Sequence, residues 1–428
     1  MSAKAKSSKT WWVTSIVVAG AAVGSIAGVG IDAYVTERGL SHPEVVSAHA
    51  VTGSFSPAEP SAEVDNGQLG AQVAELASDS RLGSFAGVLI DTTTGEQVWS
   101  LNPDEQMRPA SATKLLTAAA ALIALGEDDR LTTTVHDADE GTVVLKAAGD
   151  VMLNDAMLDQ LAAQLSGVPV EAVAMDISVW PEEEFSSKWN KSDIGGGYIA
   201  PMQPMMLNGA RMGADSGDVP RSTTSAEDVA HALAEKLGVE FIGTAEATGP
   251  TLASVTSEPL TVRLHTMMVH SDNVMAEAFG REVAVHTGYP ATQDGSRDAT
   301  LAVLAEHGID TSGMDMVDNS GLSQQNAIST AAFARVLSAV TSDPVLRPLL
   351  DTLPVAGGEG SLSSRFSGSP GEGWVRAKTG TLTDTAALAG LIPAENGHSY
   401  AFAFICNDAS ILPARAAMDE IASSIRSF

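Results

Sequence analysis

The stretch from Arg108 to Leu125 restricts the fold more than any other part of this chain. It begins Arg-Pro-Ala-Ser-Ala-Thr-Lys and continues as a run of alanine and leucine. Proline suits the first turn of a helix, and alanine and leucine have the highest helix propensities, so a helix is predicted here. Residues three apart share a helix face, which places the hydroxyl group of Ser111 beside the amine of Lys114. A desolvated lysine can take the proton of a serine hydroxyl and make it nucleophilic.

Taken alone, Ser-x-x-Lys also describes a helix cap followed by a solvated lysine, and two further motifs decide between these interpretations. Ser271-Asp-Asn273 lies on or beside a Met-rich helical pattern that continues to Glu282, and Lys378-Thr-Gly-Thr381 ends a predicted strand. Each could be an ordinary cap or turn. In this order, however, the three match the set Ser-x-x-Lys, Ser-x-Asn and Lys-Thr-Gly found in penicillin-binding proteins and class A β-lactamases.

Acyl transfer gives the catalytic residues of this set their roles. Ser111 is predicted to attack a carbonyl carbon, and Lys114, held neutral in a cationic pocket, to accept the hydroxyl proton. Ser271 would relay a proton to the leaving amine. The sequence therefore predicts a covalent acyl-enzyme that water later hydrolyses.

The remaining motif residues are predicted to bind the substrate. Asn273 would bind a substrate amide, and Lys378 would keep the site positive and lower the pKa of Lys114 by like charge. The hydroxyl groups of Thr379 and Thr381 are expected to bind a terminal carboxylate. Gly380, between them, is also predicted to belong to the substrate-binding site.

Beyond these motifs, the chain resembles the penicillin-binding protein 4 or DacB family of D-alanyl-D-alanine carboxypeptidases, of the class C penicillin-binding type. The resemblance runs in order from Leu82 to Asn407. It is carried by the motifs above and by further stretches: Ala148-Gly-Asp150, Asp176-Ile-Ser178, Trp189, Tyr198-Ile-Ala-Pro201, Asn208-Gly209, Ser271-Asp-Asn-Val-Met-Ala-Glu277, Asp318-Asn-Ser-Gly-Leu-Ser323 with Asn326, Leu353 to Gly360, and Ala377 to Leu382.

The resemblance implies an α/β transpeptidase or β-lactamase-like sandwich, in which helices flank a five-stranded antiparallel sheet and a smaller β-rich domain is inserted. It implies removal of the terminal D-Ala from peptidoglycan stem peptides ending in D-Ala-D-Ala, often with endopeptidase cleavage of cross-links. It also implies covalent inhibition by β-lactams at Ser111, an oxyanion hole formed by the backbone N–H groups of Ser111 and Thr381, and no cofactor. The insertion is shorter than is common in the family, where two nested extra domains occur.

The chain is expected to be anchored in the cell membrane. Three lysines and no acidic residue precede Trp11, and the 21 residues from Trp11 to Ile31 carry no charge, which is long enough to span a bilayer with the catalytic part outside the cytoplasm. A cleaved signal peptide, which would release the protein, is the alternative. The predicted organisation is a cytoplasmic tail (1–10), a transmembrane signal anchor (11–31), a linker (32–67), the peptidase domain in two parts (68–130 and 258–428) and the inserted domain between them (131–257).

Composition excludes several other classes of function. The net charge of −29 argues against nucleic acid as a partner. The single cysteine, Cys406, excludes an intramolecular disulfide and reads as an inert core thiol. His265 and His270 are five apart, which is not the spacing of helical zinc ligands, so no metal site is predicted. Two alternatives to a carboxypeptidase are a β-lactamase and a membrane-anchored wall-binding or sensor protein with an acylable serine.

Overall fold

The computed structural model describes residues 64–180 and 185–428. The predicted tail and anchor, and the linker up to residue 63, lie outside the described residues. Helix α2 (Asn66–Leu76) begins two residues inside the predicted linker, capped by the side chain of Asp65. Among the described residues, no helix combines the length and apolar character needed to cross a membrane.

A five-stranded antiparallel sheet forms the centre of the peptidase domain, as predicted. Its strand order is β11-β12-β13-β1-β2, so the C-terminal strands pair with those of the N-terminal part through β13 and β1. The Lys-Thr-Gly motif lies on strand β11, where the sequence predicts a strand. The bounds of the five strands are β1 (Ser84–Asp91), β2 (Gln97–Leu101), β11 (Arg376–Leu382), β12 (Thr385–Pro393) and β13 (Ser399–Asn407).

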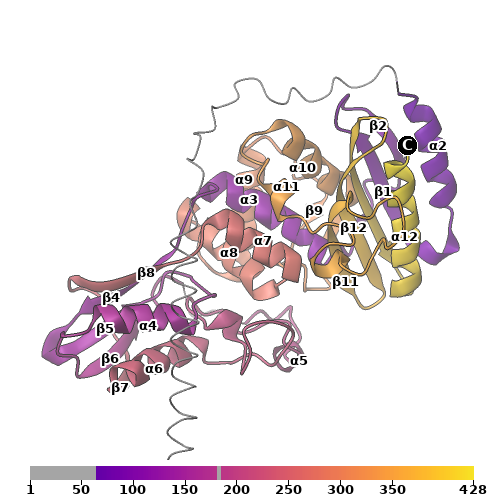
Figure 1. Cartoon of the computed structure of the whole chain (residues 1–428). Coiled ribbons are helices and arrows are strands. Elements are labelled where there is room, and N and C mark those ends of the chain that lie inside the picture. Colours follow the sequence, from indigo (N-terminus) through magenta and orange to yellow (C-terminus); the bar gives the residue numbers. More distant parts are fainter. Residues whose placement is uncertain (1–63, 181–184) are drawn as a thin grey trace, which may run out of the picture. The chain divides into compact units, whose positions relative to one another are not determined.

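Alternation along the strands divides the sheet into two buried faces. On β13, Phe402 and Phe404 belong to the core under α2 and α12 (Ile411–Arg426), whereas Ala401 and Ala403 belong to the core under the helices of the opposite face. Large side chains therefore fill one face, and small ones let helices approach the other. Figure 1 shows α2 and α12 together on one side of this sheet.

The helical layer on the opposite face carries the catalytic segments. It contains α3 (Lys114–Leu125), α7 (Leu260–His270), α8 (Asn273–Thr287), α9 (Gln293–Glu306), α10 (Thr330–Ser342) and α11 (Leu349–Thr352), with a small sheet of β3 (Gln106–Met107), β9 (Met314–Asp315) and β10 (Ala327–Ser329). The continuous helical pattern predicted from Leu260 to Glu282 is wrong at one point. Ser271 has a left-handed backbone with φ 56°, and Asp272 caps a new helix, so the chain turns between α7 and α8.

The inserted segment has a separate sheet and its own core. The sheet has the order β7-β6-β5-β4-β8 and mixes parallel and antiparallel pairs. Two helices that the sequence analysis does not predict, α4 (Asp155–Gln164) and α6 (Ser225–Leu237), complete this core, which is therefore less purely β-rich than expected. The strands are β4 (Thr132–Asp137), β5 (Thr142–Lys146), β6 (Ala172–Asp176), β7 (Glu240–Thr244) and β8 (Thr251–Thr256), and a short α5 (Ser192–Gly195) lies in the long loop before α6.

Part of the inserted segment nevertheless packs into the peptidase domain. Trp189, Ile199 and Met206 belong to the same buried cluster as residues of α3 and α8. The loop that carries them has little regular structure, so its position depends on these buried side chains. This packing brings residues of the inserted segment next to the catalytic motifs.

Cys406 is fully buried on β13, in agreement with its predicted role as a core thiol. Burial raises the pKa of its thiol group to about 12. The protonated thiol is a poor nucleophile, so this cysteine serves packing alone.

The aromatic face of the sheet leads to a prediction about stability. Phe404 is fully buried, with its ring centroid 4.9 Å from that of Phe402 and 6.0 Å from that of Phe85. Phe404→Ala leaves a cavity that these rings cannot close, so we expect it to lower the free energy of unfolding by about 3–5 kcal/mol. Leu412→Ala, at a side chain that is 73% exposed, is the control. Urea unfolding measures both, and equal losses for the two variants would contradict the packing described here.

Candidate active site

The predicted nucleophile and its predicted base lie where the chain enters α3. Ser111 lies in a 3-10 turn, Ala110–Thr113, and Lys114 is the first residue of the α-helix. The Nζ atom of Lys114 is 3.1 Å from the Oγ atom of Ser111. The predicted three-residue spacing therefore brings the two groups together, although the serine precedes the regular helix instead of lying within it.

Two glycines, Gly380 and Gly321, allow other backbone segments to lie directly against the backbone just before Ser111. A Cβ atom at Gly380 of β11 would lie 2.3 Å from the carbonyl oxygen of Pro109, and one at Gly321 would lie 2.0 Å from that of Ala110. Real side chains never approach backbone so closely. Gly380, predicted as a substrate-binding residue, thus has the additional structural role of letting the Lys-Thr-Gly strand lie against the nucleophile's turn.

Lys114 is fully buried, and its amine is held by three groups from separate parts of the chain. Besides Ser111, Nζ donates to the Oδ1 atom of Asn273 at 2.6 Å and to the carbonyl oxygen of Ser320 at 2.7 Å. Burial lowers the pKa of this amine to about 8, against the opposing charges of Asp318, Asp272 and Glu277. A substantial fraction of Lys114 is therefore neutral near physiological pH.

Burial is the main cause of this low pKa. The sequence predicts like-charge repulsion from Lys378 as the cause, and this repulsion between the two amines is present but secondary. Burial, followed by the charge of Lys114, lowers the pKa of Lys378 well below its usual value. The two amines are therefore each less strongly protonated than exposed lysines.

The third motif residue of the proton path, Ser271, contacts Lys378. The Nζ atom of Lys378 donates to the Oγ atom of Ser271 at 2.9 Å and to the carbonyl oxygen of Thr379 at 3.0 Å. Ser271 is held at the turn between α7 and α8 described above. The structure thus forms two adjacent serine–lysine pairs, one on α3 and one between the α7–α8 turn and β11.

Asp272, the middle residue of the second motif, has a structural role that the motif alone does not reveal. Burial opposes its ionisation, but Arg221 and Arg211 outweigh this and lower its pKa. The guanidinium groups of Arg211 and Arg221 lie 2.6 and 3.3 Å from its Oδ2 atom, and Oδ1 accepts from the backbone N–H of Met275. Both arginines come from the inserted segment, so this ion pair ties that segment to the turn that carries Ser271 and Asn273.

A cavity of about 730 Å³ opens over these residues. It is lined by Ser111, Ser271, Asn273, Thr379 and Thr381 of the predicted set, whereas Lys114 and Lys378 lie buried behind it. The cavity is large enough for a short peptide.

Further residues of the cavity lie outside the three motifs. Ser361 hydrogen-bonds to the hydroxyl group of Thr379 at 2.6 Å, and the guanidinium group of Arg415 donates to the hydroxyl group of Thr381. The carbonyl oxygen of Tyr198 accepts from the Nδ2 atom of Asn273 at 2.9 Å. Tyr198 and the segment before Ser361 are part of the family resemblance, but no local pattern distinguishes Arg415, which lies on α12 close to the end of the chain.

The two histidines considered above have different surroundings. Nδ1 of His265 hydrogen-bonds to the carbonyl oxygen of Asp351 at 3.0 Å, and His270 lines the cavity beside Ser271. Within residues 64–180 and 185–428, no group of three or more His, Cys, Asp or Glu side chains is arranged to hold a metal ion.

Comparison with known proteins agrees with this geometry. A sequence model of the D-Ala-D-Ala carboxypeptidase 3 (S13) family matches residues 69–227 and 210–425. Carboxypeptidase DacB of Mycolicibacterium smegmatis is 39% identical over 388 residues, covering 84% of each chain. A D-alanyl-D-alanine carboxypeptidase of Actinomadura sp. is 27% identical, covering 82% of this chain and 85% of that one.

A solved structure shows the same fold. Penicillin binding protein 4 (dacB) from Haemophilus influenzae superposes with a TM-score of 0.69 at 20% identity, covering 86% of this chain and all of that one. That protein has also been solved in complex with a β-lactam. The extent of the sequence match shows that the chain belongs to the D-Ala-D-Ala carboxypeptidase 3 (S13) family.

Proposed function

We propose that this protein is an extracytoplasmic serine carboxypeptidase that removes the terminal D-Ala from peptidoglycan stem peptides ending in D-Ala-D-Ala. The observation that carries the proposal is the buried amine of Lys114, 3.1 Å from the hydroxyl group of Ser111 and with a pKa lowered to about 8. A neutral amine at this distance can act as a general base, and the serine faces a cavity of peptide size.

The acylation step follows from these positions. The Oγ atom of Ser111 bonds to the carbonyl carbon of the penultimate D-Ala while its proton passes to Nζ of Lys114. When the C–N bond breaks, Ser271 relays that proton to the leaving nitrogen, and free D-Ala departs. The backbone N–H groups of Ser111 and Thr381, which the family resemblance assigns to the oxyanion hole, stabilise the negative oxygen formed on the way; losing one such donor typically costs about 2.7–4 kcal/mol.

Water then completes the reaction. It adds to the Ser111 ester, the peptide leaves with a new carboxyl group, and the serine hydroxyl regains a proton. Asn273 binds the substrate amide, and the hydroxyl groups of Thr379 and Thr381 receive the terminal carboxylate. Arg415, whose guanidinium group already reaches Thr381, adds positive charge at that end of the cavity. Endopeptidase cleavage uses the same acylation step and differs only in the group that leaves.

We expect Ser111→Ala to abolish both D-Ala release from a D-Ala-D-Ala peptide and covalent labelling by a fluorescent penicillin, because Ser111 is the hydroxyl group that lies beside the proposed base, Lys114. Mass spectrometry of the peptide products and gel fluorescence measure the two effects, with thermal unfolding as a check that the variant folds. A folded Ser111→Ala variant that still processed the peptide would assign this cavity to an unrelated role. Rapid turnover of penicillin by the wild-type protein, in place of a persistent adduct, would instead favour a β-lactamase.

The rate of penicillin acylation should rise with pH. Lys114 is a base only when neutral, so activity is low below its pKa of about 8 and increases as the amine loses its proton. Lys114→Arg keeps a positive charge at all accessible pH values, because arginine has a pKa above about 12. We expect this variant to lose acylation by at least about 10²-fold, the lower range for general-base catalysis. A wild-type rate that falls between pH 6 and 9 would contradict the assignment of Lys114 as the base.

We further propose that residues 11–31 anchor the enzyme in the cell membrane. The uncharged length of this segment and the lysines before it support the proposal. Expression of the full chain and of a variant lacking residues 1–31 behind a cleavable signal peptide, followed by membrane fractionation, tests it. Full-length protein should remain with the membranes at high salt and the shortened one should not, whereas a full chain found processed in the soluble fraction would show that the segment is a cleaved signal.

A further inference from the structure

Glu277 is a fully buried carboxyl group in the catalytic region for which the mechanism above has no role. It lies on α8, one helical turn after Asn273, whose side chain contacts Lys114. Its Oε1 atom accepts a hydrogen bond from the backbone N–H of Ser320 at 2.8 Å. Its Oε2 atom is also buried and has no hydrogen-bond partner among the described residues. A buried carboxylate oxygen without a donor is unfavourable, which suggests that this oxygen carries a proton.

The backbone of Ser320 connects Glu277 to the base. Its N–H group donates to Glu277, and its carbonyl oxygen accepts from Nζ of Lys114 at 2.7 Å. A shift of Glu277 would therefore move the carbonyl group that orients the amine. The distance between the amine and Ser111 depends on this orientation.

Asp318 holds the next peptide group of the same loop. The N–H of Gly321 donates to its Oδ1 atom at 2.7 Å, and the indole Nε1 of Trp189 donates to its Oδ2 atom at 2.9 Å. The carbonyl group that accepts from Lys114 belongs to the same planar peptide unit as the N–H of Gly321. The loop is thus fixed by Asp318 on one side of Ser320 and by Glu277 on the other.

Glu277 and Lys114 also interact through their charges. Burial, followed by the negative charge of Asp318, raises the pKa of Glu277 to about 8, which is the range to which burial lowers that of Lys114. An ionised Glu277 raises the pKa of Lys114. Because the charge of one group acts on the other, the titrations of the two groups are linked.

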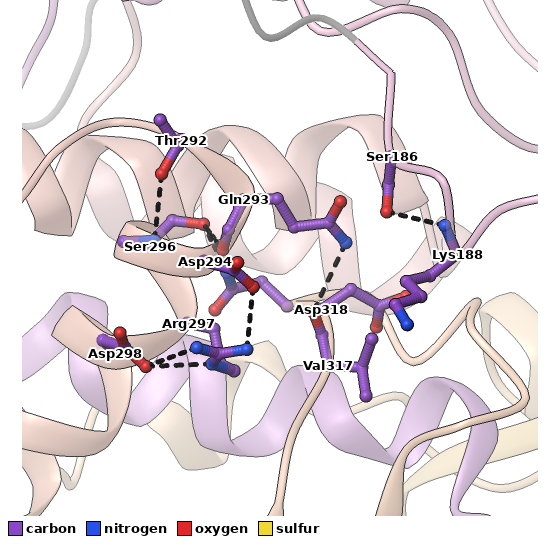
Figure 2. A network of polar contacts seen from close by, with 12 residues as sticks. Ser186, Lys188, Thr292, Gln293, Asp294, Ser296, Arg297, Asp298, Val317 and Asp318 are labelled. Atoms are coloured by element: carbon purple, nitrogen blue, oxygen red, sulfur yellow. Dashed lines mark hydrogen bonds and ion pairs between the residues drawn. The ribbon is translucent and has the colours of Figure 1, made fainter.

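The other charged groups packed around the pair have partners of their own. On α9, Arg297 pairs with Asp294 and Asp298 at the protein surface, as Figure 2 shows. On α8 itself, the guanidinium group of Arg281 lowers the pKa of Glu277 and lies over the ring of Trp180. Arg263 of α7 pairs with Glu282 and Asp129. Asp272 pairs with Arg211 and Arg221. Lys378 of β11 is hydrogen-bonded to Ser271. Lys114 is the one titratable residue of α3.

We propose that Glu277 is a positioning residue for Lys114: its carboxyl group holds the Ser320 backbone that orients the amine, and its charge controls how readily the amine gives up its proton. The proposal rests on the assignment of Lys114 as the base. With Glu277 protonated, Lys114 can be neutral and accept the proton of Ser111. With Glu277 ionised, the negative charge favours the ammonium form, so activity requires a higher pH.

Penicillin acylation of the full chain, followed from pH 5.5 to 10, tests the proposal with three variants. Glu277→Gln keeps an oxygen acceptor for Ser320 but removes the charge. We expect its half-maximal pH to fall by at least about 0.5 unit, with the plateau rate retained. Labelling at pH 7 should change little, because Glu277 with a pKa of about 8 is already mostly protonated there, and the difference should appear near and above pH 8. Glu277→Met removes the acceptor as well, and we expect its plateau to fall about 10- to 100-fold because the amine is no longer held in place.

Glu282→Gln is the matched control. Glu282 is a second buried glutamate of α8, and burial raises its pKa to about 7, but its carboxyl group pairs with Arg263 on α7, 2.7 Å away. Removal of this carboxyl group should leave the half-maximal pH of acylation unchanged. If Glu282→Gln shifted the half-maximal pH as much as Glu277→Gln does, the shift would be a general effect of removing a buried carboxyl group, and the proposal would be overturned.

The wild-type profile gives a further test that depends on no variant. Because the titrations of Glu277 and Lys114 are linked, the wild-type rate should rise over a wider pH range than a single-proton curve, and Glu277→Gln should narrow it. A single-proton wild-type curve together with an unshifted Glu277→Gln curve would overturn the role of Glu277 and leave Lys114 as the base. If penicillin did not label Ser111 of the wild-type protein, the proposed function would be overturned, and this inference with it.

Discussion

The removal of the Lys114 amine from water is the interaction on which the active site depends. An exposed lysine is protonated at neutral pH and cannot accept the proton of Ser111. Full burial lowers its pKa to about 8, and three oxygen atoms nearby keep the buried amine hydrogen-bonded. Burial without these partners would make the amine too unfavourable to retain, whereas an ionic partner in direct contact would keep it protonated. The neutral acceptors Asn273 and Ser320 avoid both outcomes.

Assembling this pocket requires segments that are far apart in the sequence. The sheet brings β11 beside the turn of Ser111, with Gly380 and Gly321 allowing backbone contact on either side. The turn between α7 and α8 presents Ser271 and Asn273 to different amines: Ser271 contacts Lys378, and Asn273 contacts Lys114. That turn exists because Ser271 adopts a left-handed conformation and Asp272 caps the following helix. The function of the Ser-x-Asn motif therefore depends on backbone geometry as well as on side-chain chemistry.

The parts of this protein that follow local rules could be predicted from the sequence. The Ala- and Leu-rich run after Lys114 forms the predicted helix, because helix propensity is encoded locally. The three motifs indicated which residues meet, but not what controls their protonation. The pKa of Lys114 depends mainly on its burial, which distant segments produce together and no local pattern encodes. Helix α6 was not predicted for another reason. Its sequence is amphipathic, but it lies within the segment that the sequence indicates as β-rich.

The inserted segment connects to the chemistry through Asp272. Two arginines from this segment surround a carboxylate that is bounded in the sequence by the proton relay and the substrate-binding amide. A buried carboxylate next to Lys114 would raise the amine's pKa strongly if its charge were unopposed, because Coulomb interactions are strong where water is absent. Arg211 and Arg221 oppose that charge while Asp272 still caps α8. The inserted segment therefore supplies positive charge to the turn that carries Ser271 and Asn273, even though neither arginine belongs to the three motifs.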